Sequence, residues 1–294
     1  MDFEEIVIET DRLDFPALAA GEGPVVVCWH GFPDHPRTFG PLAEHLVAAG
    51  RRVVAPYLRG HHPATADAMT YADGLTLAKD AAAVAEALDP GGVDMIGHDI
   101  GAGMVGRVAA AWPELVRGAV TMAVPPPAAL PPILADPEQQ KRFFYVWLFQ
   151  LPIGEAMLTP DLVEYLWKTW SPSLDAGEHV ARAKEFYADA AVKTNALRIY
   201  RGNFDTSLHD PALAELAQKT EAPASIPMLV LAGDEDGCVP AGKFTGDGLA
   251  EGSHVDIVKN AGHFIHLDRP DEVARKALDW FRFRAPSAGT PASG

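Results

Sequence analysis

Short apolar runs alternate with helix-length segments along most of this chain, and that alternation constrains its fold more than any other feature. The apolar runs predict strands at residues 25–29, 52–55, 93–96, 116–122, 228–232 and 255–258. The longer segments predict helices at residues 36–49, 73–88, 99–112, 240–250 and 270–284. Strands separated by helices are typical of an α/β fold, with a mostly parallel sheet flanked by helices. Residues 3–10 and 12–18 predict an antiparallel hairpin at one edge.

The alternation stops between about residues 125 and 224, a stretch too long for a loop and too helical for a linker. Prolines 125–127 and 131–132 interrupt regular structure at its start, and prolines 223 and 227 do so at its end. We therefore predict a core domain at 1–124 and 225–284 and an inserted helical cap, or lid, at 125–224. An insertion there would lie above the carboxyl ends of the strands, where open α/β sheets bind ligands. Residues 285–294 have nothing to bury and are predicted to be disordered.

The composition limits the classes of partner. The chain has 294 residues, of which 48% are hydrophobic, so it can build a full core. Its formal net charge of -16 argues against nucleic acid and anionic membranes, because both would be repelled. The acidic start is unlike a secretory signal, and no stretch approaches the length of a membrane span. These features predict a soluble, cytoplasmic protein that is a monomer or a homodimer.

Only two cysteines are present, Cys28 and Cys238, which is too few for a disulfide framework. We expect both to be reduced, and we expect neither a metal nor a cofactor. The neighbouring His61 and His62 are interpreted as solvated loop histidines, because the sequence places no third metal ligand near them.

An aspartate stands at the centre of a glycine-framed turn, Gly97-His98-Asp99-Ile100-Gly101. A predicted strand precedes the turn and a helix rich in small residues follows it. This is the frame of a nucleophile elbow, whose flanking glycines relieve crowding while the central side chain is exposed at the top of the sheet. The central residue of that frame is ordinarily serine. An aspartate moves the predicted chemistry away from ordinary ester hydrolysis.

Two later strands are followed by loops that supply an acid and a histidine. The loop at 233–240 contains three carboxylates, and the position of Asp236 before Val239-Pro240 favours it over Asp234. With Asp236 as the acid, the order nucleophile, acid, histidine along the chain matches the order found in hydrolases that have a nucleophile elbow. The alternative is a solvated loop carboxylate.

The histidine is predicted to be His263, because a glycine precedes it at the end of a strand. His254 and His266 compete with it, and we expect both at the surface or the edge of the core. A base that activates water, with an acid to orient it, is what a carboxylate nucleophile requires.

The turn after the strand at 25–29 predicts an oxyanion hole. Here His30-Gly31 is followed by Phe32, whose backbone N–H can pair with that of Ile100 to stabilise a developing oxyanion. A simple strand-to-helix turn is the alternative, and the elbow and the histidine favour the functional interpretation.

Together these motifs resemble the aspartate-nucleophile α/β-hydrolases, particularly the epoxide hydrolases. The resemblance rests on His30-Gly31-Phe32-Pro33, the Asp99 elbow, Gly233 with Asp236 and Pro240, and Gly262-His263-Phe264. It implies an α/β-hydrolase fold and conversion of a small hydrophobic epoxide to a vicinal diol. Asp99 would form an alkyl ester, which water activated by His263 would hydrolyse.

Two lid segments extend the resemblance. Residues 143–152 and 195–203 are similar to the segments that carry the ring-opening tyrosines of epoxide hydrolases, which implies that Tyr145 and Tyr200 bind and protonate the epoxide oxygen. The alternative is that both tyrosines belong to an aromatic core under the lid. The apolar lid residues, including Trp147 and Phe149, predict a hydrophobic substrate pocket.

Two other functions stay open. A hydrolytic dehalogenase would use the same nucleophile, and Trp147 is placed to contact a halide. Haloalkane dehalogenases, however, usually have tryptophan after the nucleophile and another donor near the oxyanion turn, where this chain has Ile100 and Phe32. Fluoroacetate dehalogenases carry arginines just after the nucleophile, whereas Arg107 lies a helical turn further on. The third possibility is a ligand-binding protein without turnover.

Overall fold

The centre of the protein is an eight-stranded sheet with the strand order β1-β2-β4-β3-β5-β6-β7-β8. The computed structural model describes residues 1–126, 129–221 and 224–284, so the predicted tail at 285–294 and the boundary prolines 127 and 223 lie outside the described residues. Strands β1 and β2 form an antiparallel hairpin, β2 is also antiparallel to β4, and the remaining pairs are parallel. The strands are β1 (Glu4–Ile8), β2 (Phe15–Ala20), β3 (Val25–Trp29), β4 (Arg52–Pro56), β5 (Val93–His98), β6 (Val116–Met122), β7 (Met228–Gly233) and β8 (His254–Val258).

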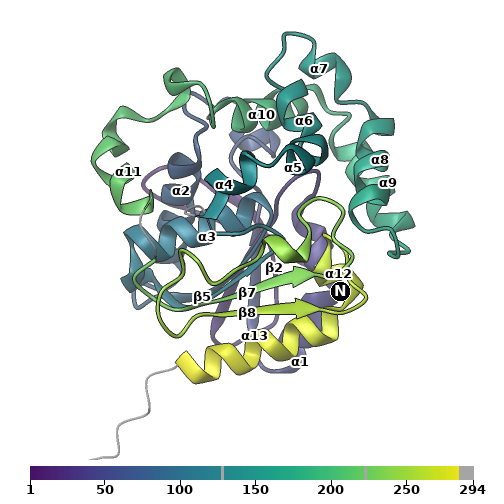
Figure 1. Cartoon of the computed structure of the whole chain (residues 1–294). Coiled ribbons are helices and arrows are strands. Elements are labelled where there is room, and N and C mark those ends of the chain that lie inside the picture. The colour runs from purple at the N-terminus through teal and green to yellow at the C-terminus, as the bar shows by residue number, and fades with distance from the viewer. Residues whose placement is uncertain (127–128, 222–223, 285–294) are drawn as a thin grey trace, which may run out of the picture.

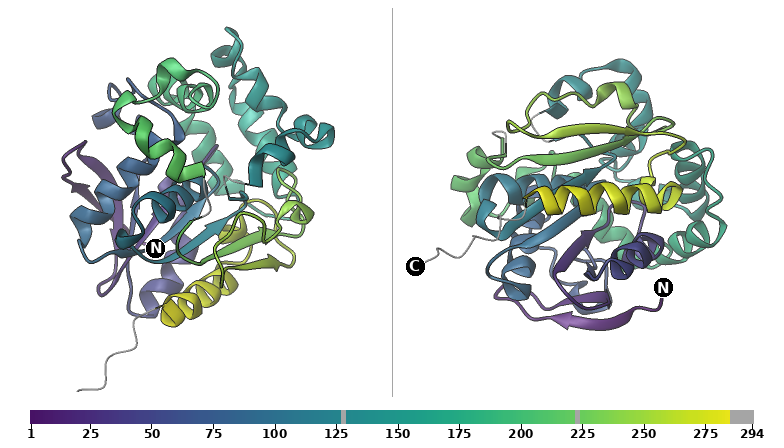
Figure 2. Two further views of the ribbon diagram at one scale, coloured as in Figure 1. Left: turned by 60° about the vertical axis from the view of Figure 1, so that its left-hand side comes forward. Right: turned by 90° about the horizontal axis from the view of Figure 1, so that it is seen from below.

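Helices cover both faces of the sheet, which confirms the predicted fold class (Figure 1). The pair α1 (Gly40–Ala48) and α13 (Pro270–Arg284) packs on one face, and α2 (Gly74–Leu88) and α3 (Ile100–Ala111) pack on the other. Strand β3 shows how the sequence achieves this, since Val26 faces the first helix pair and Val27 the second. Alternate side chains of a strand point to opposite faces, so a continuous apolar run fills both cores. Figure 2 shows α13 lying across the sheet when the molecule is seen from below.

The segment between β6 and β7 is mostly helical. Figure 1 shows its helices α4 to α10 above one end of the sheet, whereas α11 lies beside α2 and α3. An apolar cluster from this segment, the oxyanion turn and β7 joins it to the sheet. The helices are α4 (Leu130–Leu134), α5 (Pro137–Arg142), α6 (Phe144–Leu148), α7 (Gly154–Met157), α8 (Pro160–Trp170), α9 (Gly177–Phe186), α10 (Ala190–Arg201) and α11 (Ala214–Glu221). We keep the division into a core and a cap with the predicted bounds as a proposal.

The prediction of a helix at residues 240–250 is wrong. Only a single 3₁₀ turn forms there, η7 (Ala241–Lys243), and a loop follows. The segment contains Gly242, Gly246 and Gly248, and Gly248 has a φ of 76°, which lies outside the helical region. Glycine carries a high conformational cost in a helix, so an apolar pattern this short does not overcome it.

Two predictions about histidines are also wrong. His61 is only 1% exposed, because its ring packs between His30 and Tyr187, whereas the neighbouring His62 is partly exposed. His266 is fully buried rather than at a surface or core edge. The local sequence does not indicate that His61 and His266 are buried, because their packing depends on elements distant along the chain.

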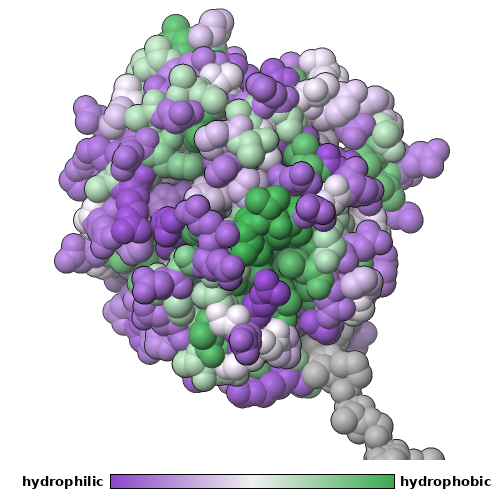
Figure 3. Space-filling model, turned by 180° about the vertical axis from the view of Figure 1, so that it is seen from behind, coloured by the Kyte–Doolittle hydropathy of each residue, from purple (hydrophilic) through white to green (hydrophobic). Residues whose placement is uncertain are grey.

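In the described part of the chain, no helix combines the length and the apolar character needed to cross a membrane. The face opposite that of Figure 1 is mainly hydrophilic, with a group of strongly hydrophobic side chains near its centre (Figure 3).

Candidate active site

Asp99 occupies a strained turn between β5 and α3. Its φ of 54° and ψ of -114° lie in a region that costs a residue other than glycine about 1–3 kcal/mol. Two glycines allow the turn: a Cβ on Gly97 would collide with the carbonyl of Gly101, and a Cβ on Gly101 would collide with the carbonyl of Trp29. The strand and helix therefore approach closely enough to present Asp99 above the end of the sheet.

Two backbone N–H groups adjoin the carboxylate of Asp99. Its Oδ1 accepts a hydrogen bond of 2.8 Å from the N–H of Phe32. A Cβ on Gly31 would lie 2.7 Å from the nitrogen of Ile100 and would collide with Asp99, so these groups share one small space. The N–H of Ile100 opens helix α3 and has no partner within the helix. The predicted pair Phe32 and Ile100 thus lies where it can stabilise a negative oxygen on Asp99.

His263 lies between two carboxylates. Its Nδ1 is 3.1 Å from Oδ2 of Asp236, and its Nε2 is 3.6 Å from Oδ2 of Asp99. The backbone N–H groups of Cys238 and Val239 donate to Oδ1 of Asp236 at 2.7 and 2.9 Å and fix its orientation. Of the competing residues, Asp234 instead faces Lys259. The structure thus brings Asp99, His263 and Asp236 together from three separate loops.

The charges at this site are strongly coupled. Burial by itself would lower the pKa of His263, but the carboxylates of Asp236 and Asp99 outweigh it and raise the pKa to about 10. Burial would likewise raise the pKa of Asp99, but the nearby imidazole of His263 and its charge lower it instead. In the free protein at neutral pH, an imidazolium therefore faces an ionised Asp99.

The loops of the acid and the base are both attached to the end of helix α8. The carbonyl of Trp170 accepts hydrogen bonds from the N–H of His263 at 2.9 Å and from that of Gly237 at 3.1 Å. The N–H of Phe264 donates to the hydroxyl of Ser171 at 3.0 Å. A Cβ on Gly262 would collide with Ser171, so glycine at this position permits the contact. Helix α8 thus holds the loops of His263 and Asp236 in place.

Sequence reasoning missed a buried polar network behind His263. His98 Nε2 lies 3.1 Å from the carbonyl oxygen of His263, and His98 Nδ1 lies 3.5 Å from the carboxylate of Asp34. The hydroxyl of Thr38 donates to the same carboxylate, and His266 lies 3.8 Å from it. His98 belongs to the elbow motif and Asp34 directly follows Pro33 of the oxyanion-turn motif, and that adjacency was the available signal.

Asp34, His98 and His266 form a buried group of side chains that could hold a metal ion. The carboxylate of Asp34, however, already accepts two hydrogen bonds within the chain. Burial would raise its pKa, but the nearby imidazole of His98 and the charges of the histidines lower it. We interpret the group as a hydrogen-bond network that supports His263, and the absence of a metal stays a prediction.

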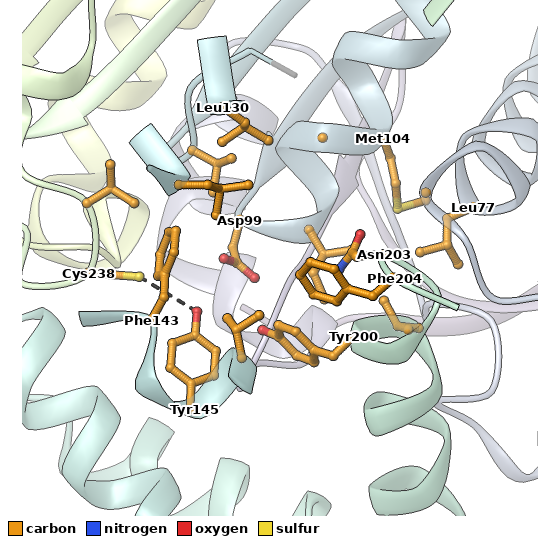
Figure 4. Close-up of a pocket in the computed structure, with 18 of the residues that line it drawn as sticks. Leu77, Asp99, Met104, Leu130, Phe143, Tyr145, Tyr200, Asn203, Phe204 and Cys238 are labelled. Atoms are coloured by element: carbon orange, nitrogen blue, oxygen red, sulfur yellow. Dashed lines mark hydrogen bonds between the residues drawn. The ribbon is translucent and has the colours of Figure 1, made fainter. Parts of the chain in front are cut away.

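A cavity of about 310 Å³ opens at Asp99, and two lid tyrosines line it. Tyr145 comes from α6 and Tyr200 from α10, and their ring centroids are 5.6 Å apart. Figure 4 shows both hydroxyls on the side of the rings that faces Asp99, with that of Tyr145 3.9 Å from the sulfur of Cys238. Burial, with smaller contributions from nearby groups, raises the pKa of both phenols well above the usual value, so both stay protonated and can donate.

The two lid residues predicted to bind substrate do not line this cavity. Phe149 is fully buried and packs against Phe32 and the two tyrosines, so it supports them from behind. Trp147 is 37% exposed and its ring packs on Phe204. The cavity walls are mainly apolar and include Phe143, one of the apolar lid residues from which the pocket was predicted. They also include residues that sequence reasoning did not assign: Leu77, Met104, Arg107, Leu130, Leu134, Val146, Asn203, Phe204, Cys238 and Val239. Of these, Leu130, Leu134, Val146 and Phe204 belong to the lid segment, whose apolar character was the only signal for them.

The fold and the site define a hydrolase of the α/β type, and comparison with known proteins agrees. Residues 26–276 match the alpha/beta hydrolase family, so the chain belongs to that family.

Its relatives along nearly the whole chain include epoxide hydrolases. It is 27% identical to the AB hydrolase superfamily protein YfhM of Bacillus subtilis and 26% identical to epoxide hydrolase A of Mycobacterium tuberculosis. Each alignment covers 94% of this chain and 96% of the relative. Epoxide hydrolase I of potato has a similar structure, with a TM-score of 0.74 at 22% identity over 96% of this chain and 100% of that one. That likeness supports the fold.

Proposed function

We propose that this hydrolase converts an epoxide to a vicinal diol through a covalent ester on Asp99. The observation that carries the proposal is that Asp99 and the hydroxyls of Tyr145 and Tyr200 line one cavity, with His263 and Asp236 beside it. A phenol is suited to epoxide opening because it can protonate the oxygen, whereas a departing halide needs no proton. The epoxide hydrolases among its relatives support the same choice.

In the first step, a carboxylate oxygen of Asp99 attacks an epoxide carbon. The ester C–O bond forms while the epoxide C–O bond breaks, and the opening oxygen takes a proton from Tyr145 or Tyr200. That tyrosine regains its proton from the imidazolium of His263, directly or through water. A serine in this position would form an ether, which the second step could not cleave.

In the second step, His263 acts as a base. The neutral ester has removed one of the two negative charges that raise its pKa, so His263 can now accept a proton from water. The hydroxide attacks the ester carbonyl carbon of Asp99, and the N–H groups of Phe32 and Ile100 stabilise the oxyanion. Collapse expels the diol as an alkoxide, which takes the proton of the new carboxylic acid. The carboxylate of Asp99 and the imidazolium of His263 are thereby restored.

A single turnover in ¹⁸O-labelled water tests this route. With the protein in excess over a panel of epoxides, we expect an unlabelled diol and label on the peptide that contains Asp99, because the water oxygen enters the aspartate. Label in the first diol formed, with none on Asp99, would mean that water attacks the epoxide directly. Turnover of organohalides with none of any epoxide would replace the proposal with a hydrolytic dehalogenase.

Loss of the tyrosine hydroxyls is expected to slow ring opening selectively. Replacing both, Tyr145→Phe with Tyr200→Phe, removes the proton donors and should lower kcat/KM for epoxides by about 10²- to 10⁴-fold, with a smaller loss for each single variant. The rate of ester formation in a stopped-flow measurement checks this. Tyr165→Phe is the matched control, since Tyr165 is 54% exposed. Ester formation at the wild-type rate in the double variant would exclude both tyrosines as proton donors.

A further inference from the structure

Arg107 lines the same cavity as Asp99. It comes from helix α3, and its Nη1 donates to the carbonyl of Gly103 at 3.1 Å. Two other arginines, Arg51 and Arg59, reach the carboxylates of buried aspartates at 2.9 and 2.6 Å. Among the residues that the structure describes, Arg107 has no carboxylate within ion-pair distance. It is therefore a cation in the cavity wall without an internal counterion in contact.

The carboxylate with the largest electrostatic effect on Arg107 is that of Asp73, and its oxygens already accept hydrogen bonds from other residues. They accept hydrogen bonds from the backbone N–H groups of Leu75, Thr76 and Asp210 and from the hydroxyl of Thr76. Burial lowers the pKa of Arg107, and the charge of Asp73 offsets this only in part. A guanidinium nevertheless stays protonated in proteins and offers five N–H donors, of which one is satisfied by Gly103.

The position of the guanidinium relative to the nucleophile follows from the helix. The guanidinium contacts Gly103, which is four residues beyond Asp99 in the chain. At the usual rise per residue, Gly103 lies about 6 Å from Asp99 along the helix axis, and the guanidinium lies at the level of Gly103. Long side chains of a helix point back toward its N-terminus, in agreement with this contact. Asn203, whose amide can also donate, lines the cavity too. In Figure 4 the apolar side chains of Leu77 and Met104 lie on the same side of Asp99 as Asn203.

We propose that the substrate is an epoxide that carries a carboxylate, which Arg107 binds about one helical turn from the carbon that Asp99 attacks. A guanidinium matches the planar geometry of a carboxylate and can bind it through two parallel hydrogen bonds. The net charge of -16 repels anions at long range, so a preference for an anionic substrate has to arise from groups inside the cavity. Arg107 is the one arginine or lysine among the described residues that line it. This inference rests on the proposed function and specifies its substrate class.

Matched pairs of substrates test the inference. The terminal epoxides of butenoate, hexenoate and octenoate place a carboxylate at increasing distance from the epoxide, and the primary amide of each is its neutral partner. For the best acid of the series, we expect wild-type kcat/KM to exceed that of the amide by about 10- to 100-fold. Arg107→Met should abolish this preference, mainly through a higher KM, and leave the amides unchanged. Arg107→Lys should keep part of the preference for the acid. The control variant Arg117→Met, outside the cavity, should keep all of that preference.

Binding measurements separate this inference from the proposed function. We expect hexanoate to bind the wild-type protein about 10- to 100-fold more tightly than it binds Arg107→Met in calorimetry, and hexanamide to bind both equally. If hexanoate behaves in this way but no epoxide is turned over, the proposed function fails and the anion site stands. Equal wild-type turnover of acids and amides would overturn the inference and leave the hydrolase intact. This last comparison needs no variant, so it decides the question even if Arg107→Met does not fold.

Discussion

Replacing His263 by glutamine is expected to stop the reaction at the covalent ester. Asp99 can still attack, because its carboxylate keeps the hydrogen bond from Phe32, but no base remains to activate water. Steady-state turnover should fall by at least about 10²- to 10⁴-fold, the usual contribution of a general base. The protein should gain the mass of one substrate, located by mass spectrometry on the peptide that contains Asp99.

The matched control is His254→Gln, because His254 is exposed on the edge strand β8. It should turn over epoxides at the wild-type rate without accumulating an adduct. If His263→Gln binds an epoxide tightly but never gains its mass, the protein is better described as a ligand-binding member of the family. Unchanged turnover in His263→Gln would show that another group activates the water.

Replacing Asp99 by asparagine is expected to abolish both the ester and turnover, with a loss of about 10⁴-fold or more, as for the removal of other covalent nucleophiles. Asparagine is among the residues that best tolerate a positive φ, so the elbow should keep its backbone. The same change removes one of the two carboxylates that raise the pKa of His263, so that pKa should fall from about 10.

Nuclear magnetic resonance of the imidazole ring measures that second effect separately from activity. The titration of His263 should move to lower pH in Asp99→Asn, and the exposed change Asp11→Asn should leave both the titration and the turnover unchanged. Substantial residual turnover in Asp99→Asn would contradict the covalent route. An unchanged titration would contradict the coupling between His263 and Asp99.

The sequence allowed the sheet to be predicted because its strands are buried on both faces and appear as continuous apolar runs. The same pattern located Asp99, Asp236 and His263, since each follows a strand whose carboxyl end lies at the same edge of the sheet. It failed at residues 240–250, where glycines outweigh a short apolar pattern. Local sequence separates strands and loops well, but it does not reveal how loops pack.

The interior of the site depends on contacts between distant segments, and sequence alone could not predict them. Asp34 and His98 meet behind His263 only because the turns after β3 and β5 lie side by side. Trp147 lies in the short helix α6 and Phe149 directly follows that helix, yet Trp147 is exposed and Phe149 is fully buried. The apolar pattern of the lid gave both the same expected role, and only their packing distinguishes them.

The attachment of the loops of His263 and Asp236 to the end of α8 limits how this protein can be re-engineered. Exchanging residues 125–224 for the corresponding segment of another hydrolase would also replace Trp170 and Ser171, whose backbone carbonyl and hydroxyl accept hydrogen bonds from the loops of His263 and Asp236. A chimaera has to reproduce these contacts to keep His263 in its position beside Asp99. Residues 167–171 have to be retained in any such graft, so changes of substrate range are better made in the other lid helices.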